Sequence, residues 1–351
     1  MFIQDAWYAA ALSEEIKREP FPRTILNAKV VMYRNSANQV VALEDRCAHR
    51  QVPLSRGLLI GDDLQCWYHG LRYNCSGECV SIPSQSTILK GMCVRTFPAV
   101  EKYGFVWLWT GDPGKADEGA IPNHWVCSAP KLAGTMNYCS VACNYLFGID
   151  NILDISHAAF VHEKTLGSLE IVQTPPEIVI NDHEVRVRRY LRREKTPPLY
   201  TKILKLDYID RFQEVLYWPV GNTRVETRAH ACDDSSGKVF HVYTTTIFTP
   251  ATDVTSHIFV GMHRDFDVDN QMFTEFTAKE VFSTVMEDKD VAESLQANWS
   301  PTAPIIDIHL DRPAFAARQI LERMGANASI RTDGGRTTRQ RAHRSQEKER
   351  R

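Results

Sequence analysis

The sequence predicts an α+β protein of two domains: an all-β N-terminal domain, and a second domain in which helices cover a curved antiparallel sheet of the helix-grip type. Three observations predict this class. The first third alternates short β-branched or aromatic runs with turn signals. The stretch Gly111-Asp112-Pro113-Gly114 then breaks any regular element. After it, several alternating runs precede a long helical pattern, and 351 residues are enough for two cores.

The N-terminal domain is expected over residues 1–113. Its clearest strands are Val30–Tyr33, Val40–Leu43 and Phe105–Trp109, which are rich in Val, aromatic and other apolar residues. Turn signals such as Gly61-Asp62 separate such runs. The domain boundary is placed at the Gly- and Pro-containing stretch that follows the last of these strands.

The second domain is expected over residues 114–330. It begins with a strand around Met136–Cys143 and a helical stretch of about Leu146–His162. Helices of about Asp269–Asn298 and Pro313–Met324 come last, and a cavity between the sheet and the long helix is the expected place for a small ligand. The intervening strands of one antiparallel sheet are expected at Glu177–Ile180, Glu184–Tyr190, Arg211–Trp218, Thr223–Ala231, Val239–Phe248 and Ser256–Met262.

Composition excludes several classes of protein. The net charge of −2 gives no whole-chain field that would favour nucleic acid, and no run of 18 apolar residues predicts a membrane span. The nine cysteines are odd in number and irregularly spaced, which favours metal binding or free thiols over a disulfide scaffold. The N-terminus lacks the pattern of a signal peptide, so we expect a cytoplasmic protein. Residues 331–351 are basic and aperiodic, which predicts a disordered tail.

The strongest motif pairs Cys47-Ala48-His49 with Cys66-Trp67-Tyr68-His69. Zinc sites of two Cys and two His usually pair like with like along the chain, whereas each half here is mixed. Mixed halves suit a [2Fe–2S] cluster in which two thiolates bind one iron and two imidazoles bind the other. A structural zinc site, or no metal, remains as the alternative.

A second motif lies in the helical stretch, where His157 and His162 follow Asp154. Two imidazoles and a carboxylate from elsewhere would form a facial triad that leaves positions open on an iron. Asp154 and His157 share a helical face, but His162 lies about 140° around an ideal helix from His157. We therefore expect a break or wide turn near Ala158–Val161. Alone, two such histidines are more often core or surface residues.

The stretch CAHRQVPLSRG…LQCWYHGLRYNCSGECVSIP resembles the Rieske loops of aromatic-ring oxygenases. Respiratory Rieske proteins instead carry an extra cysteine and a serine, at the positions of Val52 and Leu71. Further shared phrases are Ala6-Trp7-Tyr8, the Tyr103–Asp112 segment and the late Glu287-Asp288 pair. The chain thus resembles the Rieske non-haem iron oxygenases, and most of all the oxygenase components that act on vanillate, dicamba or toluenesulfonate.

The resemblance implies specific roles for the residues of the second motif. His157, His162 and Asp288 would bind a mononuclear Fe(II), with Glu287 and Asp290 as the other carboxylates on the same helix. Asp154 would act in catalysis by bridging His157 of its own chain to His69 of a neighbour, which requires a homotrimer. Asn151 would lie near the iron, although helix capping or packing explains it nearly as well.

The resemblance also implies a function. The chain would be the terminal oxygenase of a monooxygenase system that uses O₂ to hydroxylate or O-demethylate a small aromatic compound. It contains no Gly-x-Gly-x-x-Gly fingerprint, so a separate NAD(P)H-dependent reductase would supply the electrons. The alternatives are an aromatic ring dioxygenase, a Rieske electron-transfer protein without oxygenase activity, and a zinc-stabilised binding module.

The substrate pocket is expected between the strands of 223–248 and the long helix near 276–282. Only alternate residues of each strand can face it. Arg228 could meet a substrate carboxylate, but an exposed arginine is the simpler interpretation. The candidate pocket residues are Glu226, Arg228, Tyr243, Thr246 and Phe282.

Overall fold

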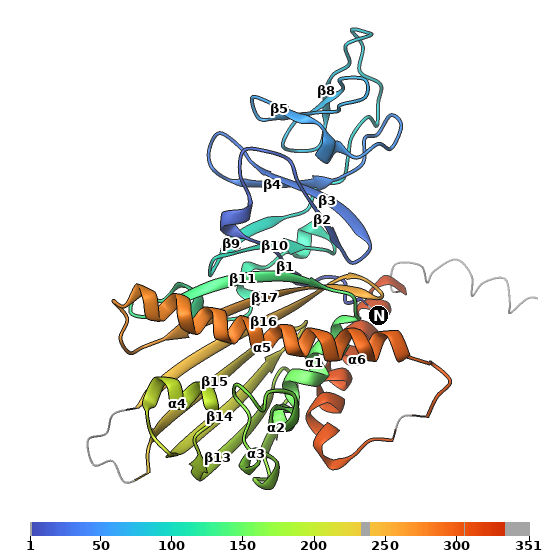
Figure 1. Cartoon of the computed structure of the whole chain (residues 1–351). Helices are drawn as coiled ribbons and strands as arrows, with labels where there is room; N and C mark the ends of the chain where they lie inside the picture. Colours follow the sequence, from blue (N-terminus) through green and yellow to red (C-terminus); the bar gives the residue numbers. More distant parts are fainter. Residues whose placement is uncertain (1, 233–238, 305, 334–351) are drawn as a thin grey trace, which may run out of the picture.

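The computed structural model describes residues 2–232, 239–304 and 306–333, with side chains described as far as Gly325. Of the tail predicted over 331–351, only 331–333 are described, and they continue the last helix; the rest lies outside the described residues. The predicted all-β domain and the predicted helix-covered antiparallel sheet are both present (Figure 1). None of the helices in the described part of the chain is long and apolar enough to cross a membrane.

The N-terminal domain consists of three small antiparallel sheets. Their strand orders are β1-β10-β9, β2-β3-β4 and β5-β6-β7-β8. The predicted strands at 30–33, 40–43 and 105–109 are confirmed as β3, β4 and β10. The ten strands are β1 (Trp7–Leu12), β2 (Phe21–Ile25), β3 (Ala28–Arg34), β4 (Val40–Glu44), β5 (Leu58–Ile60), β6 (Asp63–Gln65), β7 (Arg72–Tyr73), β8 (Cys79–Ser81), β9 (Ala99–Lys102) and β10 (Phe105–Trp109).

The second domain is built on one seven-stranded antiparallel sheet of order β11-β17-β16-β15-β14-β13-β12. All seven predicted strands are present, with ends that differ by a few residues. They are β11 (Ala133–Val141), β12 (Glu177–Ile180), β13 (Val185–Lys195), β14 (Tyr208–Trp218), β15 (Asn222–Ala231), β16 (Phe240–Thr252) and β17 (Thr255–Arg264).

Helices cover one face of this sheet (Figure 1). The long helix α5 crosses the face, α1 lies beside it, and α6 packs on α1 through an ion pair between Arg318 and Asp150. Asn270 caps α5 by accepting a hydrogen bond from the backbone N–H of Phe273 at 3.0 Å. The helices are α1 (Tyr145–Leu153), α2 (Ala158–Val161), α3 (Glu170–Gln173), α4 (Pro198–Leu204), α5 (Gln271–Asn298) and α6 (Arg312–Asp333).

The predicted break in the first helical stretch lies earlier than expected. Ala158–Val161 is itself the regular helix α2, and the irregular residue is Asp154, which has φ −118° and ψ 88°. Asp154 ends α1 and also begins a short 3-10 turn over Ile155–His157, where its carboxylate accepts from the Ser156 N–H at 3.0 Å. The predicted position was wrong because one side chain that caps a new turn interrupts the helix without changing its apolar pattern.

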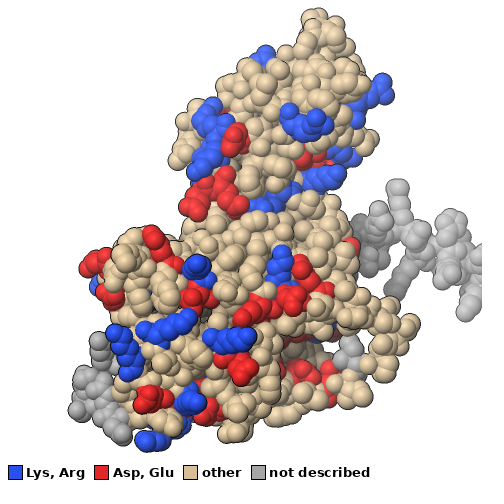
Figure 2. Space-filling model, in the orientation of Figure 1, with Lys and Arg blue, Asp and Glu red and all other residues tan. Residues whose placement is uncertain are grey.

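The two domains share an apolar core. Trp7, Phe105 and Trp107 of the N-terminal domain pack with Ile247 and Phe259 from the convex face of the large sheet. The predicted boundary at residue 113 falls in a 3-10 turn, Pro113–Lys115, shortly after β10. On the face drawn in Figure 2, basic and acidic side chains are interspersed, consistent with the near-zero net charge.

Candidate metal centres

Two loops of the same backbone design hold the first motif. In one loop the Cys47 N–H donates to the Val52 carbonyl and the Gln51 N–H to the Cys47 carbonyl. In the other, the Cys66 N–H donates to the Leu71 carbonyl and the Gly70 N–H to the Cys66 carbonyl. The fourth residue after each cysteine, Gln51 and Gly70, has a positive φ of 60° and 72°. The chain thus presents two matched loops, each carrying one thiol and one imidazole.

The cysteine and histidine side chains of this motif differ in solvent exposure. Cys47 and Cys66 are buried, whereas His49 and His69 are exposed with ring centroids 4.7 Å apart. The Tyr73 hydroxyl lies 3.2 Å from Sγ of Cys47. Burial raises the pKa of the Cys66 thiol. Two buried sulfurs beside two outward imidazoles suit a two-iron cluster whose histidine-bound iron faces the surface.

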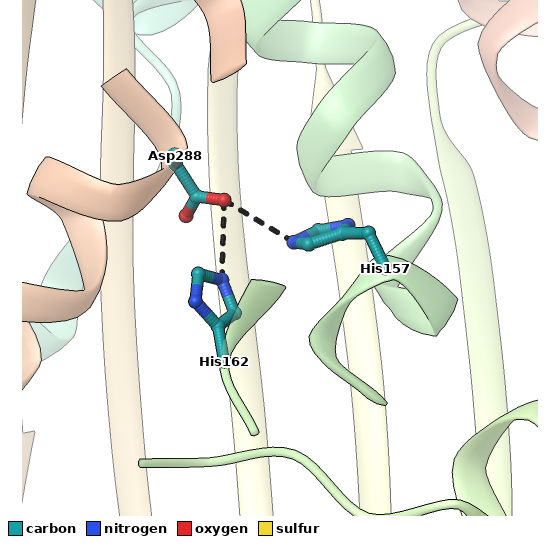
Figure 3. Close-up of side chains that lie close together, drawn as sticks. All are labelled: His157, His162 and Asp288. Carbon is teal, nitrogen blue, oxygen red and sulfur yellow. Dashed lines mark ion pairs between the residues drawn. The ribbon is translucent and has the colours of Figure 1, made fainter. Parts of the chain in front are cut away.

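The second motif converges on one point between α2 and α5. His157, His162 and Asp288 each offer a ligand atom, and these atoms lie within 4.8 Å of one another. The Asp288 carboxylate is 3.2 Å from Nε2 of His157 and 3.1 Å from Nε2 of His162 (Figure 3). Two imidazoles and one carboxylate are the donor set of a mononuclear iron site with open positions.

The other nitrogen of each imidazole is already engaged. Nδ1 of His157 lies 2.6 Å from the Asp154 carbonyl oxygen, and Nδ1 of His162 lies 2.7 Å from the Glu287 carboxylate. Both contacts favour a proton on Nδ1 and leave the Nε2 lone pair free for a metal. Glu287 is therefore placed as the partner of His162, and Asp290 is exposed. Of the three predicted carboxylates, Asp288 alone faces both imidazoles.

Electrostatics also suit a cation at this point. Burial favours the neutral form of Asp288, but hydrogen bonds from His157 and His162 outweigh it and lower the pKa of Asp288 to about 2. Burial opposes protonation of His162, but Asp288 and Glu287 outweigh it and raise the pKa of His162. The amide of Asn151 donates to Asp288 at 3.1 Å. An ionised carboxylate surrounded by donors is ready to exchange protons for a metal ion.

Asp154 differs from its expected arrangement. Its carbonyl oxygen, rather than its carboxylate, contacts His157. The carboxylate accepts from the N–H and the hydroxyl of Ser156, at 3.0 and 2.8 Å, and lies 3.6 Å from the buried Arg189. The side chain is thus held within its own turn. Arg189 has no metal-binding chemistry, so no sequence motif marks it as part of this site.

The triad opens on a cavity of about 140 Å³ between the sheet and α5. The size matches an apolar cavity that accepts one benzene ring. Asn151 and Thr246 line it, as expected. So do apolar side chains from α1, α4, α5 and the strands, among them Ile152, Ile155, Leu199, Val225, Phe248, Ile258, Val281 and Val285.

Three of the expected pocket residues lie on the face of the sheet opposite the cavity. Val225 and Thr227 line the cavity, so the alternate residues Glu226 and Arg228 lie on the opposite, convex face. There Glu226 pairs with Arg228 and lies 2.9 Å from Nε2 of His241.

Tyr243 lies on the same convex face, between the cavity-lining residues Val242 and Thr244, and its ring meets Trp125. Phe282 of α5 is not among the described residues that line the cavity, whereas its neighbour Val281 is. Glu226, Arg228, Tyr243 and Phe282 therefore do not line the cavity, contrary to expectation. Of the five expected pocket residues, only Thr246 is among the described residues that line it.

The fold and these two centres define an iron–sulfur-dependent non-haem iron oxygenase. Residues 6–98 match the Rieske [2Fe-2S] domain, and residues 141–327 match the vanillate O-demethylase oxygenase C-terminal domain. The chain therefore belongs to the Rieske non-haem iron oxygenase family, as an oxygenase component of a monooxygenase system with a [2Fe–2S] cluster and a non-haem iron.

Relatives resemble the chain over nearly its whole length. It is 33% identical to the toluene-4-sulfonate monooxygenase system iron-sulfur subunit of Comamonas testosteroni, over 92% of this chain and 97% of that protein. It is 33% identical to the dicamba O-demethylase oxygenase component of Stenotrophomonas maltophilia, over 84% and 88%. The crystal structure of dicamba monooxygenase bound to 3,6-dichlorosalicylic acid superposes with a TM-score of 0.86 at 29% identity, covering 93% of this chain and 99% of that chain.

Proposed function

We propose that the chain hydroxylates or O-demethylates a small aromatic compound, using O₂ and electrons from a separate NAD(P)H-dependent reductase. The observation that carries this proposal is the opening of the His157–His162–Asp288 triad into an apolar cavity the size of one aromatic ring. The names of relatives that act on vanillate, dicamba and toluene-4-sulfonate support it.

This proposal assigns a separate role to each group of site residues. Cys47, His49, Cys66 and His69 hold the cluster, and His157, His162 and Asp288 hold the Fe(II). When bound, the iron supplies the site at which O₂ is activated for insertion into a C–H bond. The apolar wall excludes water and holds the ring, and Asn151 keeps the Asp288 carboxylate oriented through its hydrogen bond.

The direct test is turnover with a surrogate reductase, NADH and O₂, over a panel of methoxylated and methylated benzoates and benzenesulfonates. We expect formaldehyde and a phenol from a methoxy substrate, or one ¹⁸O atom from ¹⁸O₂ in a hydroxylated product. His162→Ala should abolish product while the visible spectrum of the cluster remains. The matched control is His241→Ala on the convex face, which should retain activity. A cis-dihydrodiol would instead indicate a ring dioxygenase, and reduction of the cluster without any product would indicate an electron carrier.

We further propose a head-to-tail homotrimer. In Figure 1 the loops beside β5 and β8 that carry the first motif lie at the opposite end of the chain from α2. Apolar side chains are exposed beside both centres: Trp67 and Tyr68 next to His69, and Phe160 and Leu169 near His162. Contact between these two surfaces of different chains makes a heterologous interface, and a rotation of about 120° between neighbouring chains would close it into a trimeric ring. In this arrangement the partly exposed Asp154 would lie at the second surface and bridge the two centres.

Mixed assemblies test this arrangement. A Cys66→Ser chain lacks the cluster, a His162→Ala chain lacks the iron site, and each alone should be inactive. When the two are co-expressed, a cluster of one chain faces an intact iron site of the next, so activity should return in part. Inactive mixed trimers, or a monomer by light scattering, would contradict the proposal.

A further inference from the structure

Arg189 is a buried cation on a strand face that is otherwise apolar. It lies in β13, and its neighbours on the same face of the strand are Val187 and Leu191, which belong to the apolar core. The side chain of Arg189 is only 2% exposed. A charge buried in this way costs stability unless a partner compensates it.

The partner of this guanidinium is Asp154. Nη2 of Arg189 lies 3.6 Å from Oδ1 of Asp154, and no other carboxylate in the described part of the chain lies at ion-pair distance from Arg189. Burial lowers the pKa of Arg189, and the charge of Asp154 opposes this effect. Arginine stays protonated in proteins. A fixed positive charge therefore lies on the buried side of the Asp154 carboxylate.

The rest of the guanidinium does not tie other elements of the fold together. Nε and Nη1 of Arg189 are buried and have no hydrogen-bond partner among the residues that the structure describes. Gln213, which pairs with Arg189 across β13 and β14, has a buried Oε1 that likewise lacks a partner among those residues. The contribution of Arg189 to the described structure is therefore the charge that it places beside Asp154.

The carboxylate of Asp154 is held by three groups. Oδ1 accepts from the Ser156 N–H at 3.0 Å, and Oδ2 accepts from the Ser156 hydroxyl at 2.8 Å. Arg189 adds its charge next to Oδ1. Each carboxylate oxygen has two lone pairs, so Ser156 leaves acceptor capacity on both oxygens. Because the Asp154 side chain is also 24% exposed, its carboxylate can accept a hydrogen bond from another chain.

A cluster-bound imidazole supplies the matching donor. A histidine that binds a metal through one ring nitrogen usually donates the N–H of the other nitrogen to a carboxylate, a carbonyl or water. In the proposed trimer this donor is His69 of the partner subunit. A charge-assisted hydrogen bond of this kind is short and strong, so it requires its acceptor in a defined position. Without Arg189, the carboxylate of Asp154 would be held by Ser156 alone.

We propose that Arg189 is a positioning residue, which fixes the carboxylate of Asp154 where it can bridge the cluster histidine of the neighbouring chain to His157. This inference rests on the proposed trimer. Arg189 contacts neither metal centre, so it acts on electron transfer only through Asp154. The role explains why an arginine occupies a face that Val187 and Leu191 otherwise make apolar.

The test measures electron transfer between the two centres without any substrate. Anaerobic protein, with its cluster oxidised and its mononuclear iron as Fe(III), is mixed rapidly with dithionite that supplies one electron per chain. The cluster takes up the electron, and its visible absorbance then follows its reoxidation as the mononuclear iron is reduced to Fe(II). Fe(II) affinity, melting temperature and light scattering are measured on the same variants, so that folding, metal binding and assembly are read separately.

A mutant cycle shows whether Arg189 acts through Asp154. Arg189→Met should slow the transfer about 10-fold, and the double variant with Asp154→Asn should be no slower than Asp154→Asn alone. Arg189→Lys keeps a positive charge and should recover part of the rate. Fe(II) affinity and melting temperature should change little in Arg189→Met, because an apolar side chain of similar size is tolerated in place of a buried charge. The control is Arg192→Met, which replaces a 77% exposed arginine of the same strand and should match the wild type.

The outcomes separate this inference from the proposed function. An unchanged transfer rate in folded, iron-loaded Arg189→Met would overturn the inference, and so would loss of iron or of the fold in parallel with the rate. Slowing in the double variant equal to the product of the two single effects would show that Arg189 acts independently of Asp154, and would also overturn it. A wild-type cluster that is never reoxidised by the mononuclear iron, or a monomer by light scattering, would reject the proposed trimer itself and the inference with it.

Discussion

The backbone carbonyl oxygen of Asp154 lies 2.6 Å from Nδ1 of His157. A main-chain atom therefore fixes the tautomer of this imidazole, and Nε2 is left to face Asp288 at 3.2 Å. The carboxylate of the same aspartate is committed elsewhere, to Ser156 and Arg189. The backbone of Asp154 therefore orients His157, whereas the carboxylate of Asp154 is positioned independently by Ser156 and Arg189.

This separation predicts the behaviour of Asp154→Asn. The variant should retain its mononuclear iron, because the contact to His157 survives in the backbone and the amide oxygen can still cap Ser156. Product formation should fall by at least about 10-fold, since the charge expected between the centres is lost. Metal analysis and single-turnover assays on the same sample measure the two effects. Loss of iron in parallel with activity would show that the carboxylate has a structural role instead.

Glu287 and Asp288 should respond differently to loss of charge. Asp288→Asn removes the ionised ligand and should abolish iron binding at this centre. Glu287→Gln weakens only the hydrogen bond to Nδ1 of His162, so iron affinity should fall about 10- to 100-fold without being lost. Asp290→Asn, in an exposed position of the same helix, is the control. Iron titration followed by spectroscopy measures all three, and equal iron affinities in the first two variants would contradict the distinct roles assigned to Glu287 and Asp288.

The stability of the second domain should depend on one buried ion pair. Nη2 of Arg211 is 2.5 Å from Glu194, and both side chains are almost fully buried. Arg211→Met leaves the Glu194 charge uncompensated and should cost about 3–5 kcal/mol of unfolding free energy. The double variant Arg211→Met/Glu194→Met should recover most of this loss. Urea unfolding measures both, and a double variant no more stable than the single one would argue against charge burial as the cause.

Lowering the pH should reduce the free energy of unfolding before the carboxylates become protonated. Burial lowers the pKa of His124, His257 and His263 from 6.5 to about 4. Because their folded-state pKa lies below the unfolded value, the unfolded chain takes up protons first, and stability is lost as pH falls from about 6.5 to 4. At pH 5.5 each histidine should cost roughly 1 kcal/mol relative to pH 7.5.

A single replacement checks this pH dependence. His263→Gln should reduce the difference between urea unfolding at pH 7.5 and 5.5 by roughly 1 kcal/mol, because it removes one titrating group. Replacing the exposed His183 by Gln provides the matched control. An unchanged pH dependence in His263→Gln would mean that the pKa of this histidine is the same in the folded and the unfolded state.

Much of the fold follows from periodicity in the sequence. The seven strands of the large sheet and the helix α5 were predicted because alternation of apolar residues is strong where one face of a sheet is buried. The four Rieske residues and the two histidines could be predicted as ligands because fixed spacing of ligand residues is a local property. Helix α4 and the short helix α3 were not predicted, because they are too short to show a period.

The pocket was the least predictable part for a physical reason. Successive strand residues face opposite sides, so naming Glu226 rather than Val225 reverses the face entirely. Polar residues were chosen for their chemistry, whereas the cavity wall as a whole is mostly apolar. Arg264, which also lines the cavity, was missed because the expected strand ended at Met262, two residues before it. Its burial depends on the loop of 265–270 and on α5, which only the folded chain brings together.

The content of iron and acid-labile sulfide per chain, measured on anaerobically purified protein together with its visible spectrum, is the most direct test of the two metal centres. A cluster at Cys47, His49, Cys66 and His69 and one iron at His157, His162 and Asp288 predict about three irons and two sulfides, with a red-brown colour. His162→Ala should hold about two irons and keep the colour. Zinc without sulfide, or a wild-type protein that holds no more iron than His162→Ala after loading with Fe(II), would contradict it.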